Sequence, residues 1–414
     1  MLEKEPFERI MKKIDSYEEE MIALQIALTA IPALAPENGG EGEEKKALFL
    51  AQYLKEAGFK DVREYDAPDE RVSSGIRPNI VATLPGKNTG HTVWIITHTD
   101  VVPPGEPGFW DRDPYEGYVK NEKVYGRGTE DNQQDLVASL FAAKAFIDES
   151  VTPQLNIGLA FVADEETASR KGLEFLLENH GDLFRKSDII VVPDFGNDKG
   201  SIIEVAEKSI LWLKMKTIGK QCHASVPSRG NNAFRAASHL VARLDSLKEL
   251  FPQSDPMFTP PESTFEPTKK EANVPNINTI PGEDVFCLDC RVLPAYDLKV
   301  VQSEVKKIAN EIEVEFGVTV EIESVQEVQA PSPTLSDAPV VNALKTAIKG
   351  IYGIDAQPAG IGGGTVAAHF RQKGYPVAVW SRLGGMAHQP NEYCVVANMI
   401  GNAKVFASLF FQRT

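Results

Sequence analysis

The chain has 414 residues, of which 42% are hydrophobic and 25% are charged, and its formal net charge is −16 at pH 7. This length exceeds one ordinary core and predicts two domains. The acidic excess, without any run of Lys or Arg, excludes nucleic acid and anionic membrane surfaces as partners. Because residues 1–20 are charged and no stretch is long enough to span a bilayer, we expect a cytoplasmic protein.

The amino-terminal part predicts two helices, at residues 6–31 and 43–57. Several short apolar runs, bounded by turn residues and interleaved with helical patterns, follow along the chain. These runs are 80–84, 93–97, 157–162, 189–192 and 376–380. Near-continuous apolar strands that alternate with helices predict an α/β fold with a mostly parallel sheet sandwiched by helices.

The segment 209–326 has a different pattern, because its strands alternate polar and apolar residues. Its expected elements are strands at 211–216 and 318–323, helices near 231–247 and 297–315, and a Pro-rich loop at 252–268. This order predicts an inserted α+β domain of βαββαβ type with one exposed sheet face. We therefore place the first part of the α/β domain at 1–208 and its second part at 327–414.

The inserted segment also contains a C-x-x-C pair, Cys287 and Cys290, on an expected strand. Positions three apart on a strand point to opposite faces of a sheet, so these thiols cannot bind one metal ion. Four cysteines are also sparse for a secreted protein. We interpret the pair as buried structural thiols.

Five residues of metal-binding types each follow an expected strand of the α/β part. They are His98, Asp131, Glu166, Asp194 and His388. Ligands of an open α/β sheet bind beyond the carboxyl ends of its strands. A single carboxylate there is more often a turn residue or a helix cap, but five together favour a metal site. Two histidines and three carboxylates suit zinc, or cobalt or manganese, and sharing one carboxylate gives each of two divalent ions three ligands.

The acidic triplet Asp164-Glu165-Glu166 ends an apolar strand. Adjacent carboxylates repel one another unless positive charge lies near, which favours a cation site over the alternative of a solvated acidic turn. A water shared by two cations loses a proton readily. Glu165, beside the expected ligand Glu166, is placed to be the general base that accepts this proton.

These motifs resemble those of the co-catalytic zinc peptidase and deacylase family, and the similarity covers nearly the whole chain. The family includes acetylornithine deacetylase, succinyl-diaminopimelate desuccinylase, aminoacylase, glutamate carboxypeptidase and carnosinase-like dipeptidases. The matching motifs are His98-Thr99-Asp100, the glycine-rich 126–131, Asp164-Glu165-Glu166, Pro193-Asp194 and the histidine motif 387–392. Their joint occurrence in the family order is specific, whereas each motif alone is weak.

The resemblance implies that Asp131 bridges both ions. It pairs His98 with Asp194 on one ion and Glu166 with His388 on the other. The peptide bond after the bridging aspartate is often cis in this family, so we predict a cis bond between Asp131 and the next residue.

The resemblance also implies roles for two acidic residues outside the ligand set. Asp100 would accept the imidazole N–H of His98 and fix its tautomer. Glu165 would deprotonate the attacking water and then pass the proton to the leaving amine.

In the insert, the resemblance implies that His223 donates to the reaction's oxyanion, across a dimer interface in many relatives. Asn278 and Arg291 match residues that hold the substrate carboxylate, and Asn232 matches the start of a lid helix, where N-capping is its simplest role. Without the family, His223 would be an ordinary histidine at a strand end, and Arg291 a surface cation.

A glycine loop that includes Gly363, Gly364 and Thr365 resembles the family's backbone donors to the substrate carboxylate. A plain turn is the alternative. The chain departs from common family residues at Gln133-Gln134, Ala168, Ala367 and His369. These departures spare the metal ligands but put any named substrate in doubt, and His369 is either a pocket donor or a core histidine.

The function implied is hydrolysis of an amide bond in a small substrate with a free carboxylate, by a homodimer formed through the insert. An N-acyl amino acid deacylase is favoured, with a dipeptidase or carboxypeptidase as the alternative. Intact Glu165 argues against a catalytically silent metal-binding protein. The insert argues against a single-subunit aminopeptidase.

Overall fold

The computed structural model describes residues 4–412, which divide into two compact units. Of these residues, unit 1 contains 4–205, 334–358 and 365–412, and unit 2 contains Ala206–Pro333 and Ala359–Gly364. The sequence prediction gave 359–364 to the α/β domain. The structure assigns this segment, which begins with the end of a strand, to unit 2 because its backbone is bonded there: the Lys208 N–H donates to the Ile361 carbonyl at 2.9 Å, and the Gly360 N–H to the Met257 carbonyl at 2.8 Å.

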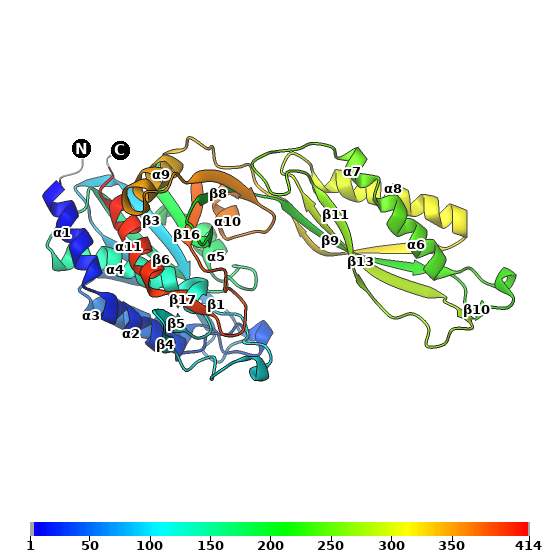
Figure 1. Ribbon diagram of the computed structural model, residues 1–414, viewed down its shortest axis with the longest axis horizontal. Helices are drawn as coiled ribbons and strands as arrows, with labels where there is room; N and C mark the ends of the chain where they lie inside the picture. The colour runs from blue at the N-terminus through cyan, green and yellow to red at the C-terminus, as the bar shows by residue number, and fades with distance from the viewer. Residues whose placement is uncertain (1–3, 413–414) are drawn as a thin grey trace. The chain divides into compact units, whose positions relative to one another are not determined.

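An eight-stranded sheet forms the centre of unit 1, with the order β1-β2-β6-β3-β7-β16-β8-β15 (Figure 1). Its strands are β1 (Asp61–Pro68), β2 (Ile76–Leu84), β3 (Asn88–His98), β6 (Leu155–Val162), β7 (Ile189–Asn197), β8 (Ile202–Glu207), β15 (Gln357–Ile361) and β16 (Val377–Arg382). The central pairs β3–β6, β3–β7 and β7–β16 are parallel. The predicted mostly parallel α/β fold is confirmed.

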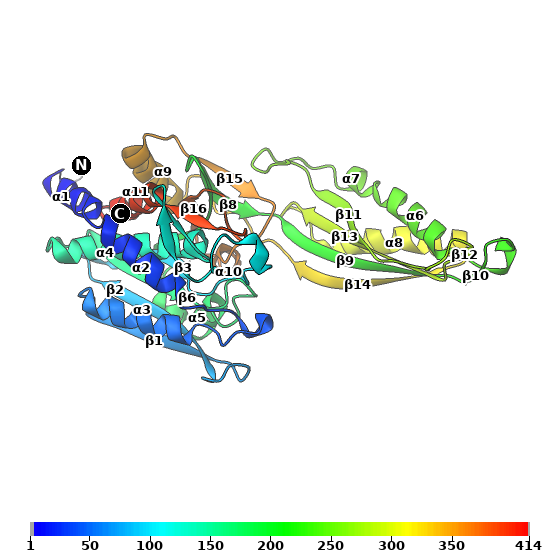
Figure 2. The ribbon, with the colours of Figure 1, turned by 60° about the horizontal axis from the view of Figure 1, so that its bottom comes forward.

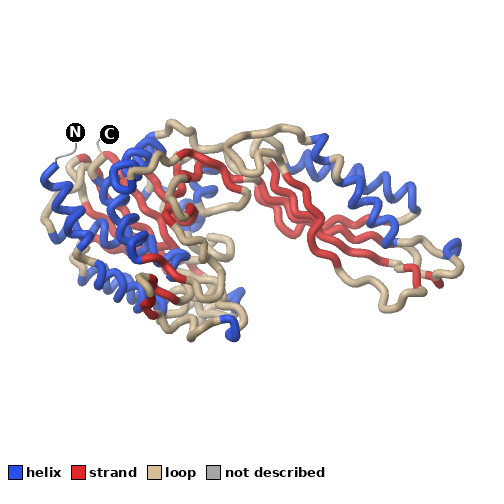
Figure 3. The backbone as a smooth tube through the Cα atoms, in the orientation of Figure 1, coloured by secondary structure: helices blue, strands red, loops and turns tan. Residues whose placement is uncertain are grey.

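Helices cover both faces of this sheet (Figure 3). On one face lie α4 (Gln134–Asp148), α9 (Pro339–Tyr352) and α11 (Val396–Phe410), and α11 packs against the other two. On the other face, α5 (Leu173–Asn179) and α10 (Ala367–Gln372) pack on Trp94 and Ile96 of β3. The alternation of β3 side chains between the two faces explains why its sequence is apolar at nearly every buried position.

The predicted helix over 6–31 was wrong, because two helices occupy this segment: α1 (Lys4–Asp15) and α2 (Glu18–Thr29). The Ser16 hydroxyl donates to the Lys13 carbonyl at 2.6 Å, a local bond that competes with helix continuation. The Tyr17 side chain turns into the core, and its hydroxyl donates to Asp148 at 2.7 Å. The second predicted helix is α3 (Glu44–Glu56).

Unit 2 has a four-stranded antiparallel sheet with helices on one face (Figure 2). Its elements are β9 (Ser209–Ile218), β10 (Cys222–His223), α6 (Ala233–Leu244), α7 (Leu247–Leu250), β11 (Thr264–Lys270), β12 (Thr279–Ile280), β13 (Glu283–Val292), α8 (Leu298–Phe316) and β14 (Thr319–Val328). The βαββαβ order is as predicted. The expected loop at 252–268 ends early, because Phe265 packs in the core and pairs with Cys290. Cys287 and Cys290 lie on opposite faces, as the alternation predicted, but only Cys290 is buried, so the interpretation of both as buried thiols was wrong for Cys287, whose face is partly exposed.

A three-stranded sheet joins two distant parts of unit 1. It consists of β4 (Tyr118–Lys120), β5 (Lys123–Tyr125) and β17 (Tyr393–Val395), with Tyr125 paired to Tyr393. The loop after β5 therefore lies beside the loop before β17. Within residues 4–412, none of the helices combines the length and apolar character needed to cross a membrane.

Candidate metal centre

Parallel strands bring the predicted metal ligands to one edge of the sheet. His98 is the last residue of β3, where it pairs in register with Val162, the last residue of β6. Glu166 follows β6 in the next turn, and Asp194 lies in the second half of β7. Because β3 is the parallel neighbour of both strands, their carboxyl ends converge at this edge.

The other two predicted ligands come from the loops that β5 and β17 bring together. Asp131 lies in the short turn η3 (Thr129–Gln133) before α4, and His388 lies in the loop before β17. His388 has a φ of +64° and a side chain that is 56% exposed. The exposed imidazole edge leaves the centre open to substrate on this side.

The five side chains form two triads that share Asp131. In the first, the His98 Nε2 atom is 3.0 Å from Asp131 Oδ1 and 3.5 Å from Asp194 Oδ1. In the second, the His388 Nε2 atom is 3.2 Å from Asp131 Oδ2 and 3.1 Å from Glu166 Oε2. In each triad all ligand atoms lie within 4.8 Å of one another. The arrangement offers two adjacent three-ligand positions with one carboxylate between them.

The electrostatics of this centre fit divalent cations. Burial alone would lower the pKa of His98, but the carboxylates of Asp100, Asp131 and Asp194 raise it well above its usual value. Hydrogen bonds to Asp131 and Glu166 raise the pKa of His388 to about 10. Within the described residues, the buried Oε1 atom of Glu166 has no hydrogen-bond partner. The cluster therefore has excess negative charge and a spare carboxylate oxygen, which a bound cation would satisfy.

Asp100 makes more contacts than the sequence predicted. Its Oδ1 atom is 3.4 Å from the Nδ1 atom of His98, whose Nε2 atom faces the other carboxylates. Its two oxygens also accept the backbone N–H groups of Glu165 at 3.1 Å and Glu166 at 3.0 Å. Asp100 thus fixes the imidazole ligand, whose Nδ1 atom hydrogen-bonds to the Asp100 backbone carbonyl at 3.1 Å, and its buried carboxylate fixes the turn that carries the expected base.

Glu165 lies beside both triads without being held by a side-chain contact. Across residues 4–412, its carboxylate forms no hydrogen bond and no ion pair with another residue. Burial, followed by the charge of Asp194, raises its pKa well above the usual value. The predicted cis peptide bond between Asp131 and Asn132 is confirmed. The Asn132 amide donates to Asp194 Oδ1 at 3.0 Å.

A buried arginine beneath the acidic triplet was missed from the sequence. Arg77 of β2 is fully buried and forms ion pairs with Glu43 and, at 3.5 Å, with Asp164. It supplies part of the positive charge that three adjacent carboxylates require. The available signal was a lone Arg in an apolar strand. An Arg is almost never buried without a partner, so a buried Arg at this position implies carboxylates beside it.

Two further glutamates, Glu130 of the glycine-rich motif and Glu392 of the histidine motif, have no role in the sequence-based prediction. Both are buried and accept several backbone N–H groups from the loops that carry Asp131 and His388. No periodicity or spacing in the sequence marks either glutamate, because their hydrogen bonds join residues far apart in the chain.

Comparison with known proteins decides the family. The model of the family described as peptidase family M20/M25/M40 matches residues 94–412. The chain belongs to this family. An uncharacterized metallohydrolase of Methanococcus maripaludis is 41% identical over 94% of this M20 chain and 98% of its own length.

Other M20 relatives differ in their named substrates. Succinyl-diaminopimelate desuccinylase of Paracoccus denitrificans is 26% identical, over 89% of this chain and 92% of its own length. A solved tripeptidase from Staphylococcus aureus has a TM-score of 0.74 at 19% identity and covers 95% of this chain and 98% of that one, which shows a shared fold. As an M20 member, the protein is a metal-dependent hydrolase of amide or peptide bonds.

Three of the residues that the resemblance assigns to substrate, His223, Asn278 and Arg291, lie in two groups within unit 2 of this M20 protein. His223 and Asn278 lie together on the short β10–β12 ribbon, where the Ala224 N–H donates to the Asn278 carbonyl at 2.8 Å. The His223 Nδ1 atom accepts the Ser225 N–H at 3.1 Å, so the neutral ring carries its proton on Nε2. Nε2 is therefore the donor that an oxyanion would need.

Arg291 lies at the other end of β13. Its Nε and Nη2 atoms donate to Asp289 at 2.7 and 3.1 Å, and its Nη1 atom donates to the Gly362 carbonyl at 3.0 Å. The guanidinium also lies 5.7 Å from the centre of the Trp212 ring. Glu283, beside the ribbon, and Arg291 are eight positions apart on β13, or about 27 Å at the usual strand rise. Arg291 is therefore too far from His223 for both to contact one small substrate within a single unit 2.

The remaining predicted contacts are less specific. Added Cβ atoms at Gly362 and Gly363 would meet nothing within 4 Å, so this part of the glycine loop is open. The Thr365 hydroxyl accepts the Ala367 N–H at 3.2 Å. Burial lowers the pKa of His369 on α10, as expected for a packed imidazole. Asn232 caps α6 by accepting the Arg235 N–H at 3.0 Å, as predicted.

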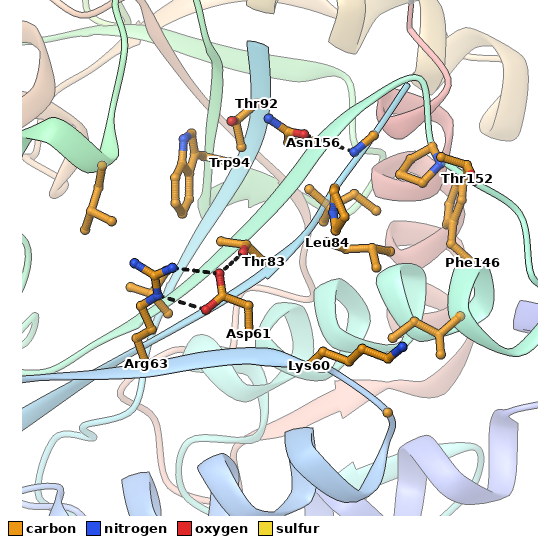
Figure 4. A pocket seen from close by; sticks show the side chains of 18 of the residues that line it. Lys60, Asp61, Arg63, Thr83, Leu84, Thr92, Trp94, Phe146, Thr152 and Asn156 are labelled. Carbon is orange, nitrogen blue, oxygen red and sulfur yellow. Dashed lines mark hydrogen bonds and ion pairs between the residues drawn. The ribbon is translucent and has the colours of Figure 1, made fainter. Parts of the chain in front are cut away.

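A cavity of about 1030 Å³ lies at the opposite ends of the parallel strands (Figure 4). Thr92 and Trp94 near the start of β3 line it, with Asn156 of β6. Its Asp61 carboxylate is already bonded to Arg63 and Thr83. Of the five predicted metal ligands none lines this cavity, so it is separate from the metal centre.

Proposed function

We propose that this M20 protein hydrolyses an amide bond with two divalent cations, held by the two triads that share Asp131. Zinc is favoured by the ligand types, with cobalt or manganese as substitutes. The observation that carries the proposal is the shared Asp131 carboxylate with the free Glu165 carboxylate beside it. Bound there, the cations would lower the pKa of water and polarise the scissile carbonyl.

The protein's own groups then have distinct tasks. Glu165 would accept a proton from the attacking water and deliver it to the leaving amine, which its lack of another partner permits. Asp100 would keep the proton of His98 on Nδ1, which leaves Nε2 free for a cation. The Nε2–H of His223 would donate to the developing oxyanion.

We infer a small substrate with a free carboxylate, bound by the outer N–H groups of Arg291 and by the open loop with Gly363 and Gly364, beside Thr365. An N-acyl amino acid is favoured, which accords with the desuccinylase relative of Paracoccus denitrificans. Cleavage of a dipeptide, or of a carboxy-terminal residue, by the same mechanism is the second candidate. Asn278, on the ribbon with His223, would contact the same substrate from a second copy of the chain, in a homodimer formed through unit 2.

The test combines one variant with a substrate panel. Glu165→Gln keeps the size of the side chain but cannot accept the proton, so hydrolysis should fall at least about 1,000-fold while metal content stays unchanged. Glu178→Gln, on the exposed side of α5, is the matched control. An active Glu165→Gln variant would remove the proposed base, and a wild type inert on all substrates would favour a silent metal-binding protein.

The panel should contain N-acetyl and N-succinyl amino acids together with dipeptides, each with a free or an amidated carboxyl group. Faster turnover of the acyl amino acids supports a deacylase, and faster turnover of the dipeptides supports the second candidate. Amidation should raise KM in either case, because Arg291 then loses its anionic partner. Equal KM values for free and amidated substrates would contradict the proposed carboxylate contact.

A further inference from the structure

Two buried glutamates connect the loops that carry Asp131 and His388. Glu130 is 1% exposed and Glu392 is 0% exposed, and neither belongs to a ligand triad. Glu130 directly precedes Asp131, and Glu392 follows His388 in the second loop. The side chain of each glutamate is hydrogen-bonded to the backbone of the loop that carries the other. Together they form what we call the carboxylate clasp, defined by the side chains of Glu130 and Glu392.

The Glu392 side of the clasp holds the turn that presents Asp131. Its Oε1 atom accepts the backbone N–H groups of Glu130 at 2.9 Å and Asp131 at 3.0 Å. Its Oε2 atom accepts the Gly128 N–H at 3.0 Å and the Arg127 Nη1 atom at 2.6 Å. The turn thus wraps around a single carboxylate, and the backbone N–H of the shared ligand itself is one of the donors.

The Glu130 side holds the loop that presents His388. Its Oε1 atom accepts the Gly384 N–H, and its Oε2 atom accepts the N–H groups of Met386 and, at 3.1 Å, of Ala387. Ala387 immediately precedes the ligand. The left-handed backbone of His388 is therefore fixed from the residue before it.

Strand pairing alone brings these loops near each other but does not fix the positions of Asp131 and His388 relative to one another. Tyr125 pairs with Tyr393, and the Gly126 N–H donates to the Glu392 carbonyl at 3.0 Å. Burying two carboxylates without a full set of cationic partners costs free energy and is weak evidence for stability. Reciprocal contacts of this kind are instead what holds ligand atoms at a fixed separation.

We propose that Glu130 and Glu392 are positioning residues that set Asp131 against His388, so that cation affinity at the position completed by His388 depends on both glutamates. This inference rests on the proposed function, because it needs the two cation positions. The coupling is reciprocal: each glutamate holds the loop that contains the other, so loss of either contact releases both loops.

The experiment is a calorimetric and spectroscopic titration of metal-free protein with Co²⁺, in which variants Asp194→Ala and His388→Ala assign each binding step to one position. Glu130→Gln and Glu392→Gln should weaken the step assigned to His388 by about 10- to 100-fold, and the other step less. The double variant should lose no more affinity than the weaker-binding single variant, because the two contacts act together. Glu204→Gln, at another buried Arg-paired glutamate of unit 1, is the control and should leave both steps unchanged.

If the glutamine variants do not fold, a less disruptive substitution provides a second test. A Cβ atom added at Gly384 would lie 3.0 Å from Glu130 Oε1, so Gly384→Ala displaces the clasp without removing its charge. It should also weaken the step assigned to His388, whereas Gly350→Ala, whose Cβ would meet nothing within 4 Å, should not.

The outcomes separate the two proposals. If wild type binds two Co²⁺ ions and the clasp variants bind both with wild-type affinity, or lose affinity equally at both positions, the clasp has no selective positioning role. Additive losses in the double variant would overturn the coupling. If wild type binds no second ion, the proposed function itself fails.

Discussion

At the scale of single residues, the site differs from the rest of the core in how its carboxylates are compensated. Arg77 forms direct ion pairs with Glu43, Asp69 and Asp164 and so compensates part of their charge. Asp131 is instead bonded to two imidazoles, of His98 and His388, which hold its pKa below the usual value although burial alone would raise it. A centre whose positive charge comes from groups that can release a proton can exchange those protons for cations.

Asp135 lies behind the centre on α4, and among residues 4–412 its hydrogen-bond partners are all uncharged. It accepts from Ser381 at 2.5 Å and from Asn402 at 2.8 Å, and burial raises its pKa to about 7. In metal-free protein, the folded state therefore keeps a proton that the unfolded chain releases near pH 4. The free energy of unfolding should fall as pH rises from about 4 to about 7 and then level off.

Asp135→Asn tests this dependence, because an amide has no proton to release in this range. Relative to wild type, the variant should gain stability on the order of a few kcal/mol between pH 4 and pH 7, measured by urea unfolding of EDTA-treated protein. A difference that stays constant with pH would mean that Asp135 titrates normally.

The ligands could be predicted from the sequence, whereas the contacts that position them could not. His98 and Glu166 follow apolar runs that predict parallel strands, and the carboxyl ends of such strands meet. The bond from the Glu165 N–H to Asp100 joins residues 65 apart in sequence, and the clasp contacts join residues more than 250 apart. No local pattern encodes such pairings.

At the scale of secondary-structure elements, β3 and β6 must pack closely for His98 to reach the sheet edge in register. Gly158 of β6 lies under the Trp94 ring of β3, where an added Cβ would come within 2.4 Å of the indole. The apolar run 157–162 indicated a strand, but the need for Gly at this position follows only from the neighbouring ring.

Gly158→Ala should therefore destabilise unit 1 by about 1–3 kcal/mol through overpacking, measured as a lower urea midpoint with an unchanged slope. Gly350→Ala on the exposed side of α9 is the control, and it should be neutral or stabilising by up to about 1 kcal/mol. Equal effects of the two substitutions would show that the β3–β6 spacing can relax.

In unit 2, the sheet orients Arg291 through Asp289, which lies on the same face of β13. Asp289→Asn removes the charge that holds the guanidinium, so we expect KM for a carboxylate substrate to rise about 10-fold with little change in kcat. Glu321→Gln on the exposed side of β14 is the control. A fall in kcat at constant KM would contradict a role in binding the carboxylate.

At the scale of the whole molecule, His223 on the β10–β12 ribbon and Arg291 at the far end of β13 lie well apart in unit 2. A homodimer in which one copy supplies His223 to the other would reconcile this separation with a shared substrate. The resemblance implied such a dimer, but the separation of His223 from Arg291 was not evident from the sequence, because no strand alone encodes the pairing of β10 with β12 or of β13 with β9.

Mixing two inactive variants tests this arrangement. Chains with His223→Ala and chains with Glu165→Ala should together regain about a quarter of wild-type activity after subunit exchange, because half of the dimers are mixed and each has one intact site. No recovery in a mixture with proven exchange would place His223 and Glu165 of the same chain in one site.

The central claim is that five side chains hold two cations through one shared carboxylate, and the metal content of the chain tests it most directly. After saturation and dialysis, elemental analysis by mass spectrometry should find two divalent cations per wild-type chain. Asp194→Ala and His388→Ala should each retain one, and Asp131→Ala should lose affinity for both. A wild-type chain that holds one cation or none, or an Asp131→Ala variant that still holds two, would contradict the account.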